Sequence, residues 1–227
     1  MRQLIKIVPT LAVLCSVLAA PAFASGGNLV SNGDFSLGHT QFKSDYSYHG
    51  YGTNDPNKGT GHDKFELGPD PTVDNNTWAS VGDHTTGTGN FMLVDGSTTG
   101  TARVWYETFN VVKGQKYNIS AWAVNFLNKA PARLIVTLNG SQKGPGLVLQ
   151  STPGTWQNLN FDWVSNTTKV TFAIVDTHTA SSGNDFGLDD ISFKPVPEAS
   201  TVVTFALLFI GGLLTLRKRA RTNATAS

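Results

Sequence analysis

Short segments in which apolar and polar residues alternate recur along the middle of the chain. Tyr117, Ile119 and Ala121 alternate with polar or aromatic neighbours, and the same period of two returns in Leu134–Leu138 and Val170–Ile174. Neighbouring side chains of a strand point to opposite faces of a sheet, so this period indicates one buried face per strand. The predicted strands are Phe91–Asp95, Ala102–Val111, Lys116–Phe126, Ala132–Leu138, Leu147–Gln150, Thr155–Trp163, Lys169–Asp176 and Phe186–Phe193.

Turn signals separate these segments. Lys113-Gly114, Asn139-Gly140 and Pro153-Gly154 are typical of tight connections, and no window of residues 25–196 shows a helical stripe. We therefore predict an all-β domain over residues 25–196, a two-sheet antiparallel β-sandwich of about eight or nine strands, most simply a jelly roll.

The first 24 residues have a different pattern. Arg2 and Lys6 precede an apolar run from Leu11 to Ala20, and Ala22-Phe23-Ala24 is a small-x-small cleavage site. This order predicts a secretory signal peptide over residues 1–24. Because Cys15 is the only cysteine, the mature chain can form no disulfide.

The last thirty residues are apolar and then basic. A helix over Thr201–Leu216 would be about 24 Å long against a hydrocarbon layer of ~30 Å, and the basic cluster Arg217–Arg221 follows at once. The pattern predicts a single C-terminal transmembrane helix with its basic end in the cytoplasm and the domain outside. The alternative is a helix buried in the core.

The charge of the central domain argues against one class of partner. Residues 25–196 hold eleven Lys/Arg and fifteen Asp/Glu, a net charge near −4. A nucleic-acid-binding domain would need a clustered basic face, so we predict no nucleic acid as partner.

The segment Gly183–Phe193 concentrates negative charge in a strand. Asp189 and Asp190 are adjacent, so at most one can easily face solvent while the other turns inward. A buried carboxylate needs a metal ion, a basic side chain or a set of backbone donors. Of metals, Ca²⁺ suits a loop rich in carboxylates and carbonyls.

A long polar stretch over residues 38–77 carries Tyr46, Tyr48 and Tyr51. Exposed tyrosines at such positions could form a flat surface on which a sugar ring stacks, because their faces are apolar and their hydroxyls can hydrogen-bond. The alternative is that these rings fix the loop onto the sandwich. The strand tryptophans, Trp105, Trp122, Trp156 and Trp163, are expected in the core or on a sheet surface.

No catalytic constellation is visible. Asp83 and His84 lie side by side in Gly82–Gly89, but neither a zinc ligand spacing nor a nucleophile with its base accompanies them. We expect both to hydrogen-bond a Gly-rich turn. Paired catalytic carboxylates should face each other across a cleft, which adjacent residues of one strand do not.

The C-terminal segment resembles a PEP-CTERM sorting signal over residues 197–221. Pro197-Glu198 begins the motif of residues 197–201, the apolar helix of residues 201–216 follows, and Arg217-Lys218-Arg219 lies in the basic end of residues 217–221. Ala199 stands where the family commonly has a second proline. The resemblance implies export in a Gram-negative bacterium, recognition and cleavage by an exosortase, and release or attachment at the cell surface, commonly beside exopolysaccharide in biofilms.

The domain resembles jelly rolls of the galactose-binding-like, carbohydrate-binding-module type over residues 28–193. The resemblance rests on Asn32–Phe35, on Gly82–Gly87 with Gly89–Gly96, and on Gly183–Phe193. It implies that the first and last strands are neighbours and share a structural calcium. Asp34 and Asp190 would be its ligands, although Ser36 stands where the family has an acid.

These observations predict an exported, non-enzymatic surface or extracellular-matrix protein, held in the inner membrane by its C-terminus before processing. It would bind extracellular polysaccharide through the loop of residues 42–65 or through a sheet face. The alternatives are a glycan-active hydrolase or lyase and a purely structural matrix component.

Overall fold

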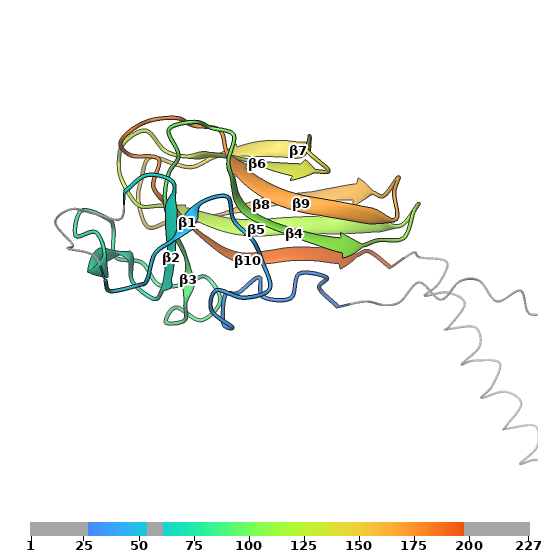
Figure 1. The fold of residues 1–227 in the computed structure, drawn as a ribbon, viewed down its shortest axis with the longest axis horizontal. Coiled ribbons are helices and arrows are strands. Elements are labelled where there is room, and N and C mark those ends of the chain that lie inside the picture. The colour runs from blue at the N-terminus through green and yellow to red at the C-terminus, as the bar shows by residue number, and fades with distance from the viewer. Residues whose placement is uncertain (1–26, 54–60, 198–227) are drawn as a thin grey trace, which may run out of the picture.

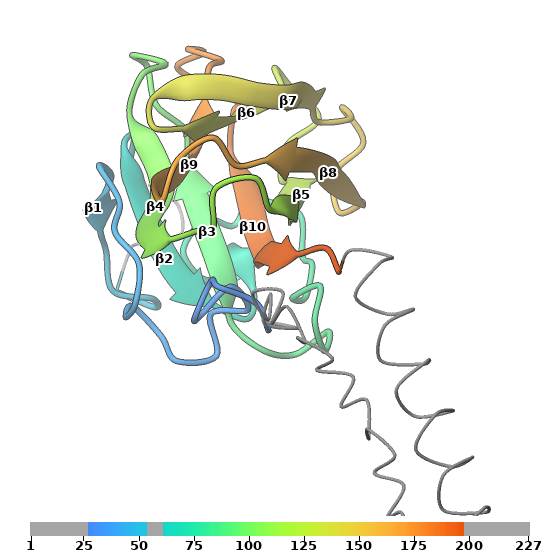
Figure 2. The same cartoon turned by 90° about the vertical axis from the view of Figure 1, so that its right-hand side faces the viewer.

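Two β-sheets face each other in the computed structural model, which describes residues 27–53 and 61–197 (Figure 1). The larger sheet has the strand order β1-β2-β3-β10-β5-β8 and the smaller has β4-β9-β6-β7. Every strand pair is antiparallel except β1 with β2. The predicted all-β, two-sheet sandwich is therefore confirmed, and Figure 2 shows the two layers from the end at which the chain leaves. The strands are β1 (Ser47–Tyr48), β2 (Lys64–Gly68), β3 (Phe91–Asp95), β4 (Arg103–Asn110), β5 (Lys116–Asn125), β6 (Arg133–Leu138), β7 (Ser141–Val148), β8 (Trp156–Val164), β9 (Lys169–Asp176) and β10 (Phe186–Pro195).

Seven strands lie within two residues of their predicted bounds, and β7 does not. The prediction placed this strand at Leu147–Gln150, whereas the structure has it at Ser141–Val148. The strand lies at the edge of the smaller sheet and is exposed along almost its whole length. It also contains Gly144, Pro145 and Gly146. Because it buries no face, its sequence has no period of two from which it could be predicted.

The strand β2 lies inside the stretch that the sequence indicates to be irregular. It pairs with β3 from Lys64 opposite Asp95 to Gly68 opposite Phe91. Four of its five residues are buried, including Glu66, so the two faces do not alternate in polarity. A strand covered on both faces gives no amphipathic signal.

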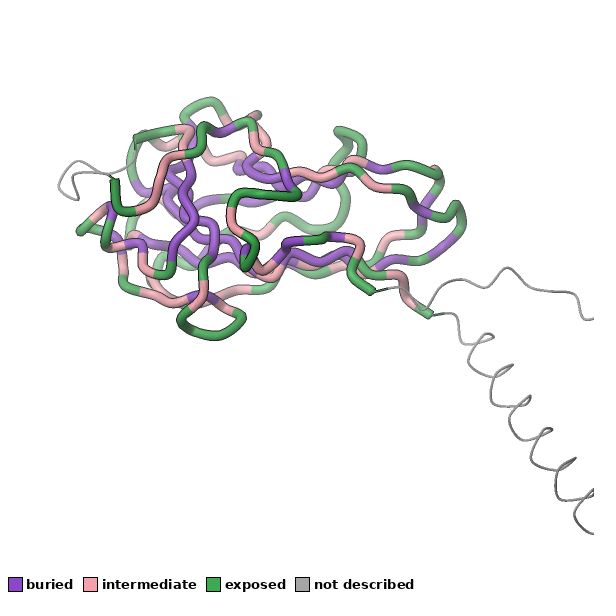
Figure 3. Tube along the Cα trace, turned by 60° about the horizontal axis from the view of Figure 1, so that its bottom comes forward, coloured by how far each residue is buried: buried purple, intermediate pink, exposed green. Residues whose placement is uncertain are grey.

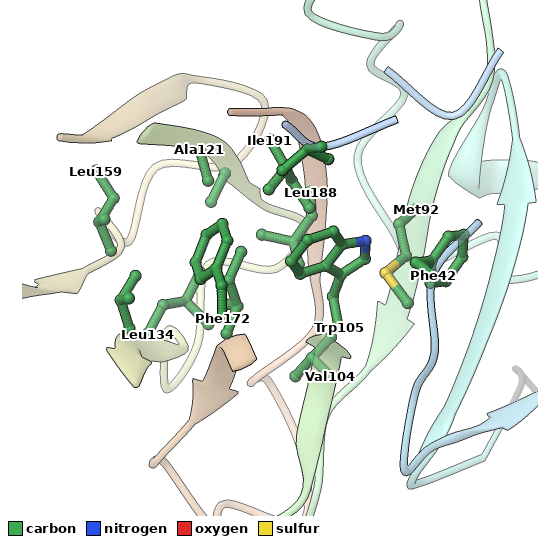
Figure 4. Close-up of a cluster of buried hydrophobic side chains, with 14 of the residues drawn as sticks. Phe42, Met92, Val104, Trp105, Ala121, Leu134, Leu159, Phe172, Leu188 and Ile191 are labelled. Carbon is green, nitrogen blue, oxygen red and sulfur yellow. The ribbon is translucent and has the colours of Figure 1, made fainter. Parts of the chain in front are cut away.

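The main core fills the space between the sheets. Buried residues follow the strands while exposed ones gather in the turns (Figure 3). Trp105 lies at its centre: its ring stacks on Phe42 at 6.5 Å and meets Phe172 edge-on at 5.1 Å (Figure 4). Of the strand tryptophans, Trp105 alone is fully buried, as expected for the core.

A second, smaller cluster covers part of the outer face of the larger sheet. It contains Trp78, Phe91, Leu93, Val124 and Phe126. The chain before β3 supplies Trp78 and crosses this face after the 3₁₀ turn Pro71–Val73. The rest of that outer face is not covered by this segment.

The two ends of the described chain lie at the same end of the sandwich (Figure 1). Leu29 donates to the carbonyl of Phe193 at 2.9 Å, so the first segment runs beside β10, as the resemblance implies. Val196 donates to the carbonyl of Lys116 at 2.8 Å, and Pro197 is the last described residue. Across residues 27–53 and 61–197, no helix has the length and apolarity needed to cross a bilayer.

Several predictions from the sequence lie outside the described residues. They are the signal peptide of residues 1–24, Glu198, Ala199, the apolar segment of residues 201–216, and Arg217, Lys218 and Arg219.

The contact between the first segment and β10 depends on a glycine. A Cβ on Gly33 would lie 1.9 Å from the carbonyl oxygen of Ile191. Gly33→Ala should therefore lower the free energy of unfolding by about 1–3 kcal/mol, because one segment must move away from the other. Gly27→Ala is the matched control, since a Cβ there meets nothing within 4 Å. Urea unfolding measures both variants, and equal stabilities would contradict the close approach.

Candidate functional site

The uncovered part of the larger sheet's outer face carries a polar hollow of about 520 Å³. Alternation along β5 explains its floor: Ile119 and Ala121 face the core, whereas Asn118, Ser120 and Trp122 face outward into the hollow. The floor therefore combines one large aromatic ring with short hydrogen-bonding side chains.

The first segment forms one wall of the hollow. The side chain of Asn28 fixes this segment to β10, since its amide nitrogen donates to the carbonyl of Ile191 at 3.2 Å and its oxygen accepts from the amide of Phe193 at 2.8 Å. Ile191 also donates its own amide to the carbonyl of Gly33 at 2.9 Å. The backbone of the wall is thus held along the last strand.

A β-bulge in β10 forms the end of the hollow. The register with β5 shifts between Asp189 and Ser192, and Asp190 has φ 48°. A non-glycine residue in this region is strained, and bulges are one way in which sheets re-aim a side chain. Asp189 is buried while Asp190 is half-buried and lines the hollow. The prediction that one of the two acids is buried is confirmed, but both carboxylates meet the same loop, since the Thr85 hydroxyl donates to Asp189 at 3.2 Å and to Asp190 at 2.8 Å. The expectation that alternation points them to opposite faces is therefore wrong, because the bulge interrupts the alternation.

Backbone donors from the loop of residues 82–89 satisfy the buried carboxylate. Asp189 accepts from the amide of His84 at 2.8 Å and from the amide of Thr85 at 3.1 Å through the same oxygen. Backbone donors were one of the three remedies that the sequence left open. Burial raises the pKa of Asp189 to about 7; the charge of Asp190 also raises it, and amide donors oppose the shift.

The same loop places an imidazole on the tryptophan. The His84 ring stacks on Trp122 with centroids 3.8 Å apart and planes 17° apart, and its Nδ1 lies 2.6 Å from a carboxylate oxygen of Asp190. Trp156 meets His84 at 5.7 Å and donates from its indole nitrogen to the carbonyl of Gly82 at 3.1 Å. The half-buried Trp122 ring is therefore held on one face by His84 and also lines the hollow.

Asp83 has the structural role that the sequence predicts. Its carboxylate accepts from the amides of Thr86 at 2.8 Å and Gly89 at 2.7 Å. His84 does more than predicted, because it joins the loop to both Asp190 and Trp122.

The three tyrosines do not form one exposed surface, and that expectation is corrected. Tyr46 is only 4% exposed, and its hydroxyl accepts from the amide of Ser97. Tyr51 is half-buried against the second cluster and donates to the carbonyl of Asp70. Tyr48 alone is exposed, at 46%. Tyr46 and Tyr51 pack because their rings fill space beside β2 and β3, as the alternative reading expected.

The two predicted calcium ligands lie in the same hollow. Asp34 and Asp190 both line it, but Asp34 accepts from Ser36 at 2.9 Å and Asp190 is engaged by His84 and Thr85. In the described part of the chain, no group of three or more His, Cys, Asp or Glu could hold a metal ion. Two carboxylates supply at most four of the 6–8 oxygens that Ca²⁺ takes, so the other ligands of a calcium ion here would be carbonyl or water oxygens.

Trp122 is the site residue that the sequence predictions did not single out. The sequence could have indicated it, because Trp122 follows Asn118 and Ser120 at every second position and therefore lies on the same polar face of an alternating strand. The approach of His84 had no local signal, because the loop and β10 are about a hundred residues apart.

Comparisons with solved structures bear on the fold. The N-terminal CBM22-1–CBM22-2 tandem domain of Paenibacillus barcinonensis Xyn10C is similar, with a TM-score of 0.50 and 16% identity, covering 79% of this chain and 48% of that one. TmCBM61, solved in complex with β-1,4-galactotriose, has a TM-score of 0.46 and 11% identity over 75% of this chain and 100% of its own. No family model and no curated protein matches the chain. The first of these likenesses supports the jelly-roll β-sandwich as the fold.

The buried carboxylates make stability depend on pH. Burial raises the pKa of Asp176 and Asp185 to about 6 and that of Asp189 to about 7, from an ordinary 3.8. The folded state therefore holds protons that the unfolded chain has released, so the free energy of unfolding should fall as the pH rises from about 4 to about 7.

Asp189→Asn should make this fall shallower, as measured by urea unfolding across that pH range. Asp162→Asn is the control, because hydrogen bonds from Asn118 and Lys116 lower the pKa of that exposed carboxylate, which titrates below this range. A slope unchanged by Asp189→Asn would contradict the assignment.

Calcium binding stays a prediction from the resemblance. If the ion binds the folded chain, EDTA should lower the melting temperature and added Ca²⁺ should restore it by mass action. The Asp34→Asn/Asp190→Asn double variant should lose this response. A melting temperature that neither EDTA nor added Ca²⁺ changes would contradict calcium binding by the domain.

Proposed function

We propose that this protein is a non-catalytic component of the cell surface or extracellular matrix that binds polysaccharide through the hollow on the larger sheet. The observation that carries the proposal is Trp122, a half-buried aromatic ring on an otherwise polar sheet face. Sugar rings present apolar faces bordered by hydroxyls, and they are complementary to an aromatic ring beside amide and hydroxyl groups.

The support of the ring favours binding with little rearrangement. The His84 imidazole covers one face of Trp122, and the donors to Asp189 hold the loop that carries it. A ring fixed in this way loses little conformational entropy when a ligand contacts it. The solved structures named above are a module in complex with β-1,4-galactotriose and a tandem of CBM22 modules.

Export and attachment complete the proposal. The signal peptide of residues 1–24 would direct secretion, and the segment of residues 197–221 would hold the protein in the membrane until an exosortase cleaves it. The protein would then act beside exopolysaccharide in a biofilm. These steps rest on the sequence and its resemblance to PEP-CTERM proteins. Fractionation of the native host, with mass spectrometry of the mature C-terminus, tests destination and processing together.

The positions of the acids favour binding over catalysis. Glycan hydrolysis commonly needs a protonated carboxyl and a second carboxylate on either side of the scissile bond. Asp189, whose pKa burial raises, lies beneath the loop of residues 82–89 and does not line the hollow. Asp34 and Asp190 line it but accept hydrogen bonds from their own neighbours. Turnover of a glycan by the purified protein, lost on Asp190→Asn, would overturn this part of the proposal.

Trp122→Ala should weaken retention on a polysaccharide affinity gel by about tenfold or more, equivalent to roughly 1.4 kcal/mol, because the ligand loses its aromatic contact. Xylan, β-1,4-galactan and the host's own exopolysaccharide are suitable gels.

Tyr48→Ala is the matched control, since it removes an exposed aromatic ring outside the hollow. Unchanged melting curves would show that both variants fold. If Tyr48→Ala loses retention while Trp122→Ala keeps it, the loop of residues 42–65 is the binding site. If the unsubstituted protein binds none of the gels, a purely structural role is favoured.

A further inference from the structure

The end of the sandwich at which the chain leaves for its C-terminal segment is rich in lysine. Lys113, Lys116, Lys169 and Lys194 are all exposed there. They come from both sheets, since Lys116 and Lys194 belong to the larger sheet and Lys169 begins a strand of the smaller. We call these four residues, together with the turn of residues 111–115, the lysine end.

Carboxylates are scarce at the lysine end. Residues 110–118, 136–143, 160–171 and 191–197 contain a single acid, Asp162, which pairs with Lys116 at 2.8 Å. The opposite end holds Asp95, Asp176 and Asp185, all three buried, and also the exposed cations Lys129 and Arg133. The lysine end is therefore basic although the net charge of the domain is negative.

Two exposed valines lie between these lysines. Val112 is 50% exposed and Val164 is 56% exposed. Their segments are adjacent, because Gly114 donates to the carbonyl of Ser165 at 2.7 Å and Ser165 donates to that of Gln115 at 2.9 Å. The tip of the lysine end thus presents apolar side chains within a basic rim.

The C-terminal segment leaves the domain beside this tip. Gln115 donates from its side chain to the carbonyl of Val196 at 2.8 Å, which fixes the exit against the turn of residues 111–115. The apolar run of residues 202–216 follows within a few residues in the sequence, and a basic cluster follows that. Any membrane that receives the apolar run therefore lies close to the lysine end.

We propose that the lysine end docks the domain onto an anionic phospholipid surface. Its ammonium groups would pair with headgroup phosphates while Val112 and Val164 enter the headgroup layer. Anionic headgroups attract basic residues near the membrane surface, and apolar side chains that enter the headgroup layer add to the binding. The proposal rests on the membrane attachment proposed above. Because Lys194 also lines the hollow, the test uses Lys113 and Lys169, which do not.

The full chain tests this proposal with two kinds of vesicle, phosphatidylcholine alone and phosphatidylcholine with phosphatidylglycerol. The apolar segment contributes to binding in both, and the basic cluster of residues 217–221 raises the ratio of the two partition coefficients equally in every variant. The change in this ratio between variants therefore reports the contact made by the lysine end. Each lysine near an anionic surface contributes about fivefold to binding. Lys113→Glu/Lys169→Glu should therefore reduce the ratio by at least about tenfold, and 0.5 M NaCl should do the same to the unsubstituted chain by screening.

Lys129→Glu/Arg133→Glu is the matched control, because both residues are exposed and lie away from the lysine end. This pair should keep the ratio. Hydrogen exchange adds a second readout: anionic vesicles should protect residues 111–115 and 164–168 in the unsubstituted chain, and the Lys113→Glu/Lys169→Glu variant should lose this protection.

Three outcomes would overturn the proposal. The first is a ratio of one for the unsubstituted chain, and the second is an equal loss in both double variants. The third is binding to a polyuronate such as alginate that depends on Lys113 and Lys169 while the vesicle ratio does not, which would make an acidic glycan the partner. Failure of the membrane attachment is distinguishable, because it would appear as absent binding to neutral vesicles.

Discussion

The last strand carries a carboxylate into the protein interior, and the arrangement around the hollow depends on how that charge is satisfied. Among the residues that the structure describes, Asp189 accepts its hydrogen bonds from the amides of His84, Thr85 and Asp190 and from the Thr85 hydroxyl, not from a lysine or arginine. These donors bring the loop of residues 82–89 onto β10. Once the loop is there, the His84 ring lies on Trp122 and its Nδ1 meets Asp190. The hydrogen bonds to Asp189 thus bring His84 and Trp122 together with Asp189 and Asp190, although these residues come from three distant parts of the chain.

The first segment depends on the same strand. It has no regular strand of its own, yet it runs beside β10 through Leu29, Asn28 and Gly33. The bulge that turns Asp190 outward lies where this contact meets β5. The strained backbone of Asp190 is held by pairing on both sides, which is the condition under which such strain persists in folded proteins.

The sequence allowed most of the sandwich to be predicted, because strands with one buried face alternate in polarity. It failed where that physical cause is absent. β2 is buried on both sides, β7 is exposed on both sides, and neither alternates. For the site, the different burial of Asp189 and Asp190 was expected of adjacent strand residues, but the bulge that brings both carboxylates to one loop was not. The partner of Asp189 and the packing of Tyr46 did not, since both depend on contacts between segments far apart in the sequence.

The form of β7 has a consequence wherever many copies of the domain lie close together. An outer strand with free amides can recruit a strand from another molecule, and close neighbours make such fusion more frequent. Pro145 has no amide hydrogen to offer, and the glycines on either side of it weaken any extended pairing. The edge strand of the smaller sheet is therefore poorly suited to pairing with a strand of another molecule. This disfavours aggregation when many copies are concentrated together.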